Sequence, residues 1–292
     1  MFICKLLPIN IRPSSIKINT KKCLNSSSFG ISRRNFSNSV NSTINDRIQY
    51  ISDIHLEYRE EIPLIPKVGN NLALLGDIGN PFKDNYTEFL KYTSVNWDRV
   101  FLLAGNHEYW QSQHNYDEVN KKIKEITQQF NNVYFLNNQL YELENYTIIG
   151  STLWSKIDKE PTVRMGDDTC IKMNNKPITF SELNNLHTNS VNCISSQINQ
   201  NKKPIIVLTH YLPSYDLIIE KYQTKRYKPY YDRFASRLDH LLKDPVKFWI
   251  CGHSHCNIET QINNVYCGIN AFGYPKQSNT KNINSFSKFI DL

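Results

Sequence analysis

The chain lacks any long hydrophobic run. None of its apolar stretches reaches the roughly 18 consecutive residues that a membrane-spanning helix needs, so the sequence predicts no transmembrane segment. Material for a core is present, because 40% of the 292 residues are hydrophobic and 12% are aromatic. A chain of 292 residues suits one large domain or two small ones.

Acidic residues are missing from the first 45 positions, which carry seven lysines and arginines. Of the 34 basic residues in the chain, 27 lie beyond this stretch and balance the 27 acidic residues there. The net charge of +7 therefore belongs to the first 45 residues. Since the remainder offers no general attraction to nucleic acid, we expect no stable nucleic-acid binding.

The same acid-free stretch is rich in serine, a composition that is typical of a mitochondrial transit peptide. Its segment 33–39 resembles the presequence pattern in which an arginine lies two residues before a cut, and a serine-containing octapeptide would then run from Phe36 to Thr43. We expect a disordered leader over residues 1–45, directing the protein to the mitochondrial matrix, and one domain over residues 46–292. The alternative is a basic tail without an address, which would leave the protein in the cytoplasm. A lysine and a proline interrupt the first apolar residues and disfavour a secretory signal.

The seven cysteines are an odd number at irregular spacings. Because a disulfide framework normally shows an even count in a short secreted chain, free thiols in a reducing compartment are the simpler interpretation. Cys251 ends an apolar run and is expected to be buried as a small hydrophobic residue.

Polar residues follow five short apolar runs that are typical of buried strands. The runs are residues 48–52, 72–75, 100–104, 205–208 and 248–251. The residues that follow them are Asp53-Ile54-His55, Gly76-Asp77, Gly105-Asn106-His107-Glu108, Thr209-His210 and Gly252-His253-Ser254-His255. Because open α/β sheets bind ligands at the carboxyl ends of their strands, we expect the five ends to meet in one metal centre.

Helices should accompany these strands. Apolar residues spaced by three and four predict an amphipathic helix over residues 114–130, and Thr179 with Glu182 forms a capping box that opens a helix to about Gln200. Further expectations are helices over 85–95 and 230–243, strands over 133–136, 141–143 and 146–149, an excursion over the site at 155–178, a loop at 213–229 and a hairpin near residues 263–264. Alternating strands and helices early, with strands late, predict an α/β fold with two sheets covered by helices.

The residue types at the five strand ends suit divalent ions. Carboxylate and amide oxygens together with imidazole nitrogens favour Mn, Fe or Zn over Ca or Mg. In an extended segment Asp53 and His55 would point to the same side and could clamp one ion, as could His253 and His255. Asp77 could bridge two ions.

Each motif has a plainer interpretation when it is taken alone. Asp53 could cap a turn, Asp77 could be an ordinary turn residue, and His210 could be a hydrogen-bonded core histidine. The two histidines of the last motif could join Cys251 and Cys256 in a zinc knuckle, but the spacing does not match the usual CxxC pairs. The ordered set favours the metal centre, because all five blocks follow expected strands.

In this order, D-x-H, GD, GNHE, TH and GHSH resemble the calcineurin-like metallophosphoesterase superfamily over roughly residues 47–275. The resemblance implies a two-sheet β-sandwich flanked by helices in four layers. It also implies one divalent ion bound by Asp53, His55 and His255, a second bound by Asn106, His210 and His253, and Asp77 bridging the two. His107 takes the place of the catalytic acid, and Glu108 would orient His107 or shape the loop.

This resemblance implies a hydrolase that cleaves a phosphate mono- or diester, most simply a small phosphate ester. The metal pair would generate a hydroxide near neutral pH, and His107 would protonate the leaving oxygen. Residues 53–57 and 150–155 and the pair Gly273-Tyr274 resemble a small-phosphoesterase branch. The extra Asp and Arg-rich continuation of Ser/Thr protein phosphatases is not seen.

Two other functions can be weighed against the sequence. A catalytically weak binding scaffold of the same fold is disfavoured, because every ligand position and His107 are filled. A P-loop nucleotide binder is excluded, because Tyr274 stands where the lysine is needed after the GxxxxG spacing of Gly268 and Gly273.

The sequence offers six candidate residues for substrate contacts. Four basic residues on expected loops could clamp a phosphate, although solvated surface charge is the simpler expectation for each: Arg59, Arg164, Lys225 and Arg226. Tyr109 and Trp110 follow the catalytic motif and could stack on a nucleobase or pack in the core.

Overall fold

The computed structural model describes residues 46–110, 113–158, 166–278 and 286–292. The expected leader over residues 1–45 lies outside the described residues, and so does Arg164.

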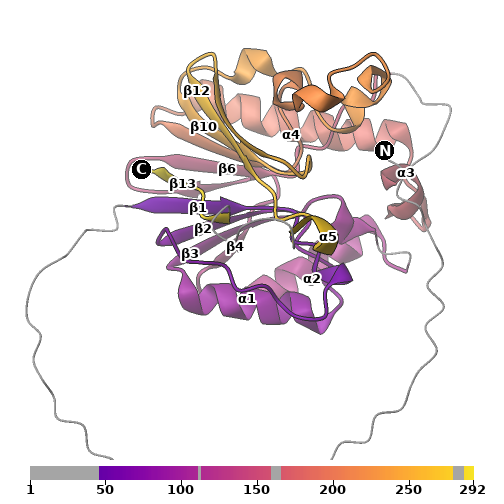
Figure 1. The fold of residues 1–292 in the computed structure, drawn as a ribbon, viewed down its shortest axis with the longest axis vertical. Helices are drawn as coiled ribbons and strands as arrows, with labels where there is room; N and C mark the ends of the chain where they lie inside the picture. The colour runs from indigo at the N-terminus through magenta and orange to yellow at the C-terminus, as the bar shows by residue number, and fades with distance from the viewer. Residues whose placement is uncertain (1–45, 111–112, 159–165, 279–285) are drawn as a thin grey trace, which may run out of the picture. The chain divides into compact units, whose positions relative to one another are not determined.

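Two large sheets dominate the described part of the chain (Figure 1). The five-stranded sheet has the order β13-β1-β2-β3-β4. Its strands are Arg47–Ile51 (β1), Asn71–Leu75 (β2), Arg99–Leu103 (β3), Val133–Phe135 (β4) and Phe289–Asp291 (β13). Strands β1 to β4 run parallel, and β13 pairs antiparallel with β1. Their carboxyl ends therefore open on one edge.

The six-stranded sheet has the order β11-β12-β10-β9-β6-β5. Its strands are Gln139–Glu142 (β5), Thr147–Ser151 (β6), Ile205–Thr209 (β9), Val246–Cys251 (β10), Asn257–Ile262 (β11) and Val265–Asn270 (β12). The central strands are parallel and the two edge strands antiparallel. The expected hairpin is confirmed between β11 and β12, where Asn263 and Asn264 adopt φ values of 50° and 66°.

The sheets pack on each other through alternate residues of their strands. Ile48 and Tyr50 of β1 belong to a buried cluster with Ile206 and Leu208 of β9 and Ile250 of β10. The intervening strand residues join a second cluster that includes the apolar residues of the helices. Strands that are buried on both faces appear as continuous hydrophobic runs, so these strands could be predicted from the sequence.

Helices cover the outer face of each sheet. Asp84–Asn96 (α1) and Tyr116–Thr127 (α2) lie on the five-stranded sheet, and Phe180–Gln200 (α4) lies on the six-stranded sheet (Figure 1). The predicted capping box opens α4, because the Glu182 N–H donates to Thr179 Oγ1 and the Thr179 N–H to Glu182 Oε2. The expected four-layer α/β sandwich is therefore confirmed.

Among the helices of the described residues, none combines the length and the apolar character that a membrane crossing requires.

The helix expected over residues 230–243 is wrong. Short 3-10 turns stand there instead, Lys228–Arg233 and Asp239–Leu241. Between them Ala235 forms an isolated bridge with Leu212, whose backbone groups hydrogen-bond to Phe234 and Ser236. Tertiary pairing has overridden the apolar spacing.

The excursion at 155–178 holds a short helix, Asp167–Cys170 (α3), and a small hairpin, Lys172–Met173 (β7) with Lys176–Pro177 (β8). A last short helix, Pro275–Ser278 (α5), follows β12.

Candidate metal centre

The five predicted strand ends meet at one place. Asp53 is the second residue after β1, and its backbone N–H donates to the Gly76 carbonyl at the end of β2 over 3.0 Å. In the other sheet, the Gly252 N–H after β10 donates to the His210 carbonyl after β9 over 2.9 Å. The backbone thus ties neighbouring strand ends together within each sheet, and the two pairs face each other across the sandwich.

One group of side chains combines both sheets. Asp53, His55, Asp77 and His255 each offer a ligand atom, and these atoms lie within 4.8 Å of one another. His55 Nε2 is 3.0 Å from His255 Nε2, which in turn is 3.3 Å from Asp53 Oδ1. This is the set that the resemblance assigned to the first ion.

A second group lies beside the first. The ligand atoms of Asp77, His210 and His253 form it. His210 Nε2 is 3.0 Å from Asn106 Oδ1 and 3.2 Å from His253 Nδ1. These are the residues assigned to the second ion, and no cysteine belongs to either group within the described residues.

Asp77 is shared by the two groups. Its Oδ1 lies 3.4 Å from His210 Nε2, whereas its Oδ2 lies 3.9 Å from His55 Nε2. One carboxylate therefore turns one oxygen toward each group, which is the arrangement that a bridging ligand requires. All seven predicted ligands are brought together, and that they hold metal stays a prediction.

Each of the four histidines has one ring nitrogen held from outside the groups. Nδ1 of His55, His210 and His255 faces Glu57 Oε1, the Leu75 carbonyl and Gln277 Oε1, at 2.9, 2.8 and 2.9 Å. Nε2 of His253 faces the Arg233 carbonyl at 3.3 Å. An acceptor fixes the proton on the outer nitrogen and leaves a lone pair on the inner one. Inner nitrogens 3.0 and 3.2 Å apart repel unless a proton or a cation lies between them, so the donor set fits divalent cations.

The buried carboxylates and imidazoles of the two groups shift one another's pKa values. Burial alone would lower the pKa of His210, but the Asp77 carboxylate raises it to about 9. Burial and the facing His210 lower the pKa of His253 to about 3. Burial would raise the pKa of Asp77, and the surrounding imidazoles hold it well below its usual value. Without a cation, the centre therefore holds protons in its place.

The backbone at the ligands differs from the expectation. The prediction that Asp53-x-His55 and His253-x-His255 are extended is wrong, because these residues have φ values of 55°, 53°, 67° and 52°. Asp77 is also left-handed, with φ 53°. A left-handed residue turns its side chain sharply, so both members of each pair still enter the site. This conformation costs on the order of 1 kcal/mol or more per residue and is common at functional sites.

Glu108 ties together the loops after β2 and β3. Its fully buried carboxyl group accepts the N–H groups of Gly105, Asp77 and Ile78 over 2.7, 3.0 and 2.7 Å. Burial and the Asp77 carboxylate raise the pKa of Glu108 to about 8. Of the two predicted roles, the structure therefore shows loop shaping. A glycine is needed at position 105, because a Cβ there would collide with Asp77 Oδ1.

His107 lies at the edge of the two groups. Its Nδ1 is 3.0 Å from Glu57 Oε1, and its backbone N–H donates to Asp77 Oδ1. Its ring stacks on the Trp110 indole with the ring centroids 3.9 Å apart. The Tyr274 hydroxyl lies 3.4 Å from Nε2. Burial would lower the pKa of His107, but Asp77 and Glu57 raise it to about 9. The imidazole therefore carries a proton near neutral pH in the metal-free protein.

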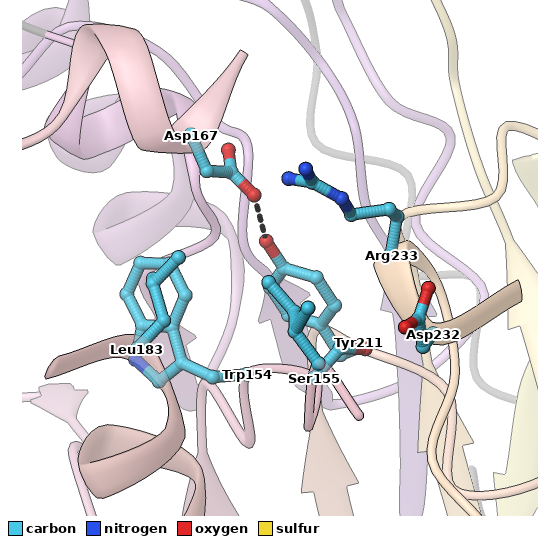
Figure 2. Close-up of a pocket in the computed structure, with 8 residues that line it drawn as sticks. Trp154, Ser155, Asp167, Leu183, Tyr211, Asp232 and Arg233 are labelled. Atoms are coloured by element: carbon cyan, nitrogen blue, oxygen red, sulfur yellow. Dashed lines mark hydrogen bonds between the residues drawn. The ribbon is translucent and has the colours of Figure 1, made fainter. Parts of the chain in front are cut away.

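Four contributors to the site were missed by the sequence reasoning: Glu57, Asp167, Tyr274 and Gln277. Glu57 and Tyr274 stood in two of the three motifs that resemble the small-phosphoesterase branch, but the sequence assigned them no role. Asp167 and Gln277 lie in segments without any pattern. Asp167 Oδ1 accepts from Asn106 Nδ2 and Trp110 Nε1. Its Oδ2 accepts from the Tyr211 hydroxyl, the contact drawn in Figure 2.

The predicted substrate contacts fare unevenly. Arg59 donates to the carbonyls of Ile54 and Gly273 over 2.6 Å each, so it fastens two loops and its guanidinium is occupied. Lys225 and Arg226 are exposed on their loop. Tyr109 is buried and donates to Asn120, which is the core-packing alternative.

Comparisons with known proteins agree with this geometry. The family model described as calcineurin-like phosphoesterase matches residues 47–257. An uncharacterized protein of Acanthamoeba polyphaga mimivirus is 33% identical over 275 residues, covering 84% of this chain and 96% of the viral protein. The crystal structure of phosphopantetheinyl hydrolase from Mycobacterium tuberculosis shares the fold with a TM-score of 0.62 at 13% identity, covering 85% of this chain and 96% of that one.

Proposed function

The chain belongs to the calcineurin-like phosphoesterase family and is a metal-dependent hydrolase acting on phosphoric ester bonds, and from this premise we propose that it works through a dinuclear centre with His107 as general acid. The substrate is a small phosphate mono- or diester. The observation that carries the proposal is the shared carboxylate of Asp77, which turns one oxygen to each group of ligands.

The ligand residues divide between two ions. Asp53, His55 and His255 would hold one and Asn106, His210 and His253 the other, with Asp77 shared by the two groups. Carboxylate, amide and imidazole donors suit Mn, Fe or Zn. When bound, two such ions would supply a hydroxide nucleophile near neutral pH and positive charge against the phosphoryl oxygens.

His107 supplies the proton for the leaving oxygen. Glu57 accepts from its Nδ1, which leaves the Nε2 proton directed away from that carboxylate, on the side of the Tyr274 hydroxyl. In the metal-free protein Asp77 and Glu57 favour the protonated ring. A charged imidazole that is held at both its backbone and its Nδ1 is oriented before substrate arrives, which is what general acid catalysis needs.

The first experiment measures metal-dependent turnover. The full chain is stripped of metal, supplied with Mn, Fe, Zn or Mg, and assayed on bis-p-nitrophenyl phosphate and p-nitrophenyl phosphate. Asp77→Asn should abolish turnover, whereas Asp98→Asn, the same change at an exposed position, should not. The preferred ester separates diesterase from monoesterase. Metal uptake without turnover on either ester would contradict the proposal in favour of a binding scaffold.

The acid role has a test of its own. His107→Ala should lower kcat by about 100-fold or more on an alkyl phosphate, whose leaving oxygen needs a proton. On p-nitrophenyl phosphate, whose leaving group is stable as an anion, the loss should be smaller. Equal losses on both esters would sink the assignment.

We also propose that residues 1–45 direct the protein to the mitochondrial matrix, on the strength of their seven basic and no acidic residues. Imported full chain should be protected from protease inside isolated mitochondria, whereas a chain starting at residue 46 should stay outside. If both chains behave alike, the leader carries no address.

A further inference from the structure

Asn106 is the only member of the ligand set whose donor atom is chosen by the rotation of an amide. Its Oδ1 must face His210 for it to serve as a ligand, and its Nδ2 must then face outward. The amide could equally turn around, since Asn presents both groups at nearly the same place. Something outside the groups has to select the orientation, as Glu57 and Gln277 do for His55 and His255.

Asp167 meets the outward side of this amide. Its Oδ1 accepts from Asn106 Nδ2 over 2.9 Å, while Asn106 Oδ1 stays 3.0 Å from His210 Nε2. A carboxylate can only accept hydrogen bonds from an amide, so it binds the NH2 group and rejects the carbonyl oxygen. The orientation with Oδ1 inward is therefore favoured.

Two further donors fix the Asp167 carboxylate itself. Trp110 Nε1 donates to the same Oδ1 over 2.8 Å, and the Tyr211 hydroxyl donates to Oδ2 over 2.7 Å (Figure 2). Gly166 packs against the Trp110 indole, since a Cβ there would fall 2.9 Å from Trp110 Cζ2. The carboxylate is thus held between the ring that stacks on His107 and the residue that follows His210.

The segment that carries Asp167 is anchored independently. Asp168, fully buried, forms an ion pair of 3.0 Å with Arg233, whose carbonyl holds His253 Nε2. The first turn of α3 is therefore fastened to the same side of the centre as Asn106, His210 and His253. Nothing comparable reaches from α3 to Asp53, His55 or His255 in the contacts of the described residues.

We propose that Asp167 is a positioning residue for the second metal site, setting the Asn106 amide so that this half of the centre binds its ion. The inference rests on the proposed dinuclear function. Outer partners of metal ligands are commonly worth about 10–100-fold in metal affinity. The effect should be confined to one ion, because Asp167 touches only one set of ligands.

The test measures metal binding, not turnover. Metal-free full chain is titrated with Mn²⁺ by calorimetry, and electron paramagnetic resonance distinguishes a coupled pair of ions from a single ion. Asp167→Ala should weaken one of two equivalents by about 10–100-fold and leave the other. Asp167→Asn, which keeps an acceptor oxygen but loses the charge, should restore affinity to within about threefold. Asp158→Ala, an exposed carboxylate in the same excursion, is the matched control and should bind both ions normally.

Other outcomes are equally definite. Two tightly bound ions in Asp167→Ala would overturn the inference and leave the dinuclear centre standing. Equal weakening in Asp167→Ala and Asp167→Asn would overturn it too, because charge and not orientation would then be the cause. Circular dichroism of each variant checks that the fold is intact. A wild-type chain that takes up a single ion would overturn the proposed function, and this inference with it.

Discussion

The Glu57 carboxylate lies 3.0 Å from Nδ1 of His107, and the same Oε1 atom lies 2.9 Å from Nδ1 of His55. Burial would raise the pKa of Glu57, but hydrogen bonds to the two rings lower it to about 2. One ionised carboxylate thus orients both a proposed metal ligand and the proposed acid.

Glu57→Gln should therefore impair catalysis more than binding. The neutral amide no longer favours the protonated His107 ring, so kcat on an alkyl phosphate should fall by about 10–100-fold with a smaller change in KM. Steady-state kinetics at saturating metal measure both constants. Glu60→Gln, an exposed neighbour, is the control. An unchanged kcat would show that the carboxylate is dispensable for the acid.

Glu108→Gln should destabilise the protein. The amide would place an NH2 group against backbone N–H donors that now share one carboxyl group, at a cost of about 2 kcal/mol in the free energy of unfolding. Urea unfolding of the metal-free protein measures the difference. Glu125→Gln on the exposed face of α2 should stay within about 0.5 kcal/mol of wild type. Similar values for both variants would contradict the loop-shaping role.

Metal should stabilise the native state strongly. The unfolded chain scatters the seven ligands, so each ion binding only the native state adds about 2.7 kcal/mol at a free concentration 100 times its Kd. Thermal unfolding of metal-free protein with increasing Mn²⁺ should show a rising Tm. Asp77→Asn, which removes the shared carboxylate, should show a much smaller rise. A Tm that does not change with added metal would show that the native centre binds no metal.

The metal-free protein should lose stability as the pH rises from about 6.5 to 9. The pKa of His210 is raised from its ordinary 6.5 to about 9, so its stabilising contribution is complete below 6.5 and is lost through 9. His107, with its pKa raised to about 9, and Glu108, with its pKa raised to about 8, act in the same direction, because the native state again binds more protons than the unfolded state. His253, with its lowered pKa, is neutral in the native state throughout this window and in the unfolded state over most of it, so it contributes little to the slope.

Urea unfolding of the metal-free protein at the two ends of this window tests the slope. A decrease of several kcal/mol is expected, because the raised pKa of His210 alone corresponds to about 3 kcal/mol across this window. In Asp77→Asn the slope should be shallower, because the carboxylate that raises the pKa of His210 is gone. Stability that rises with pH would show that the proton is not held there.

Much of the fold and of the ligand set could be predicted because both depend on residues that are close together in the sequence. Strands such as β2 and β9 are buried on both faces and appear as uninterrupted apolar runs, and each ligand follows within a few residues of a strand end. The positions where chemistry enters were therefore visible in the sequence itself.

What escaped prediction depends on contacts between distant segments. The Asp167 carboxylate accepts a hydrogen bond from the Asn106 amide, which lies 61 positions away in the sequence, and no motif spacing predicts that contact. The helix expected over 230–243 failed for the same reason, since the pairing of Leu212 with Ala235 decided the backbone. The left-handed conformations of Asp53 and His55 are imposed by hydrogen bonds to Gly76 and Asp77, which a local pattern does not contain.

The division of the ligands between the two sheets bears on the order of biosynthesis. Asp53, His55, Asp77 and Asn106 are translated well before His210, His253 and His255, and each group of ligands draws on both sets. Under the proposed assignment, a nascent chain that has not yet reached residue 210 could complete neither set of ligands. Both ions could be bound only after the chain has passed His255, so the proposed centre is completed late although more than half of its ligands are made early.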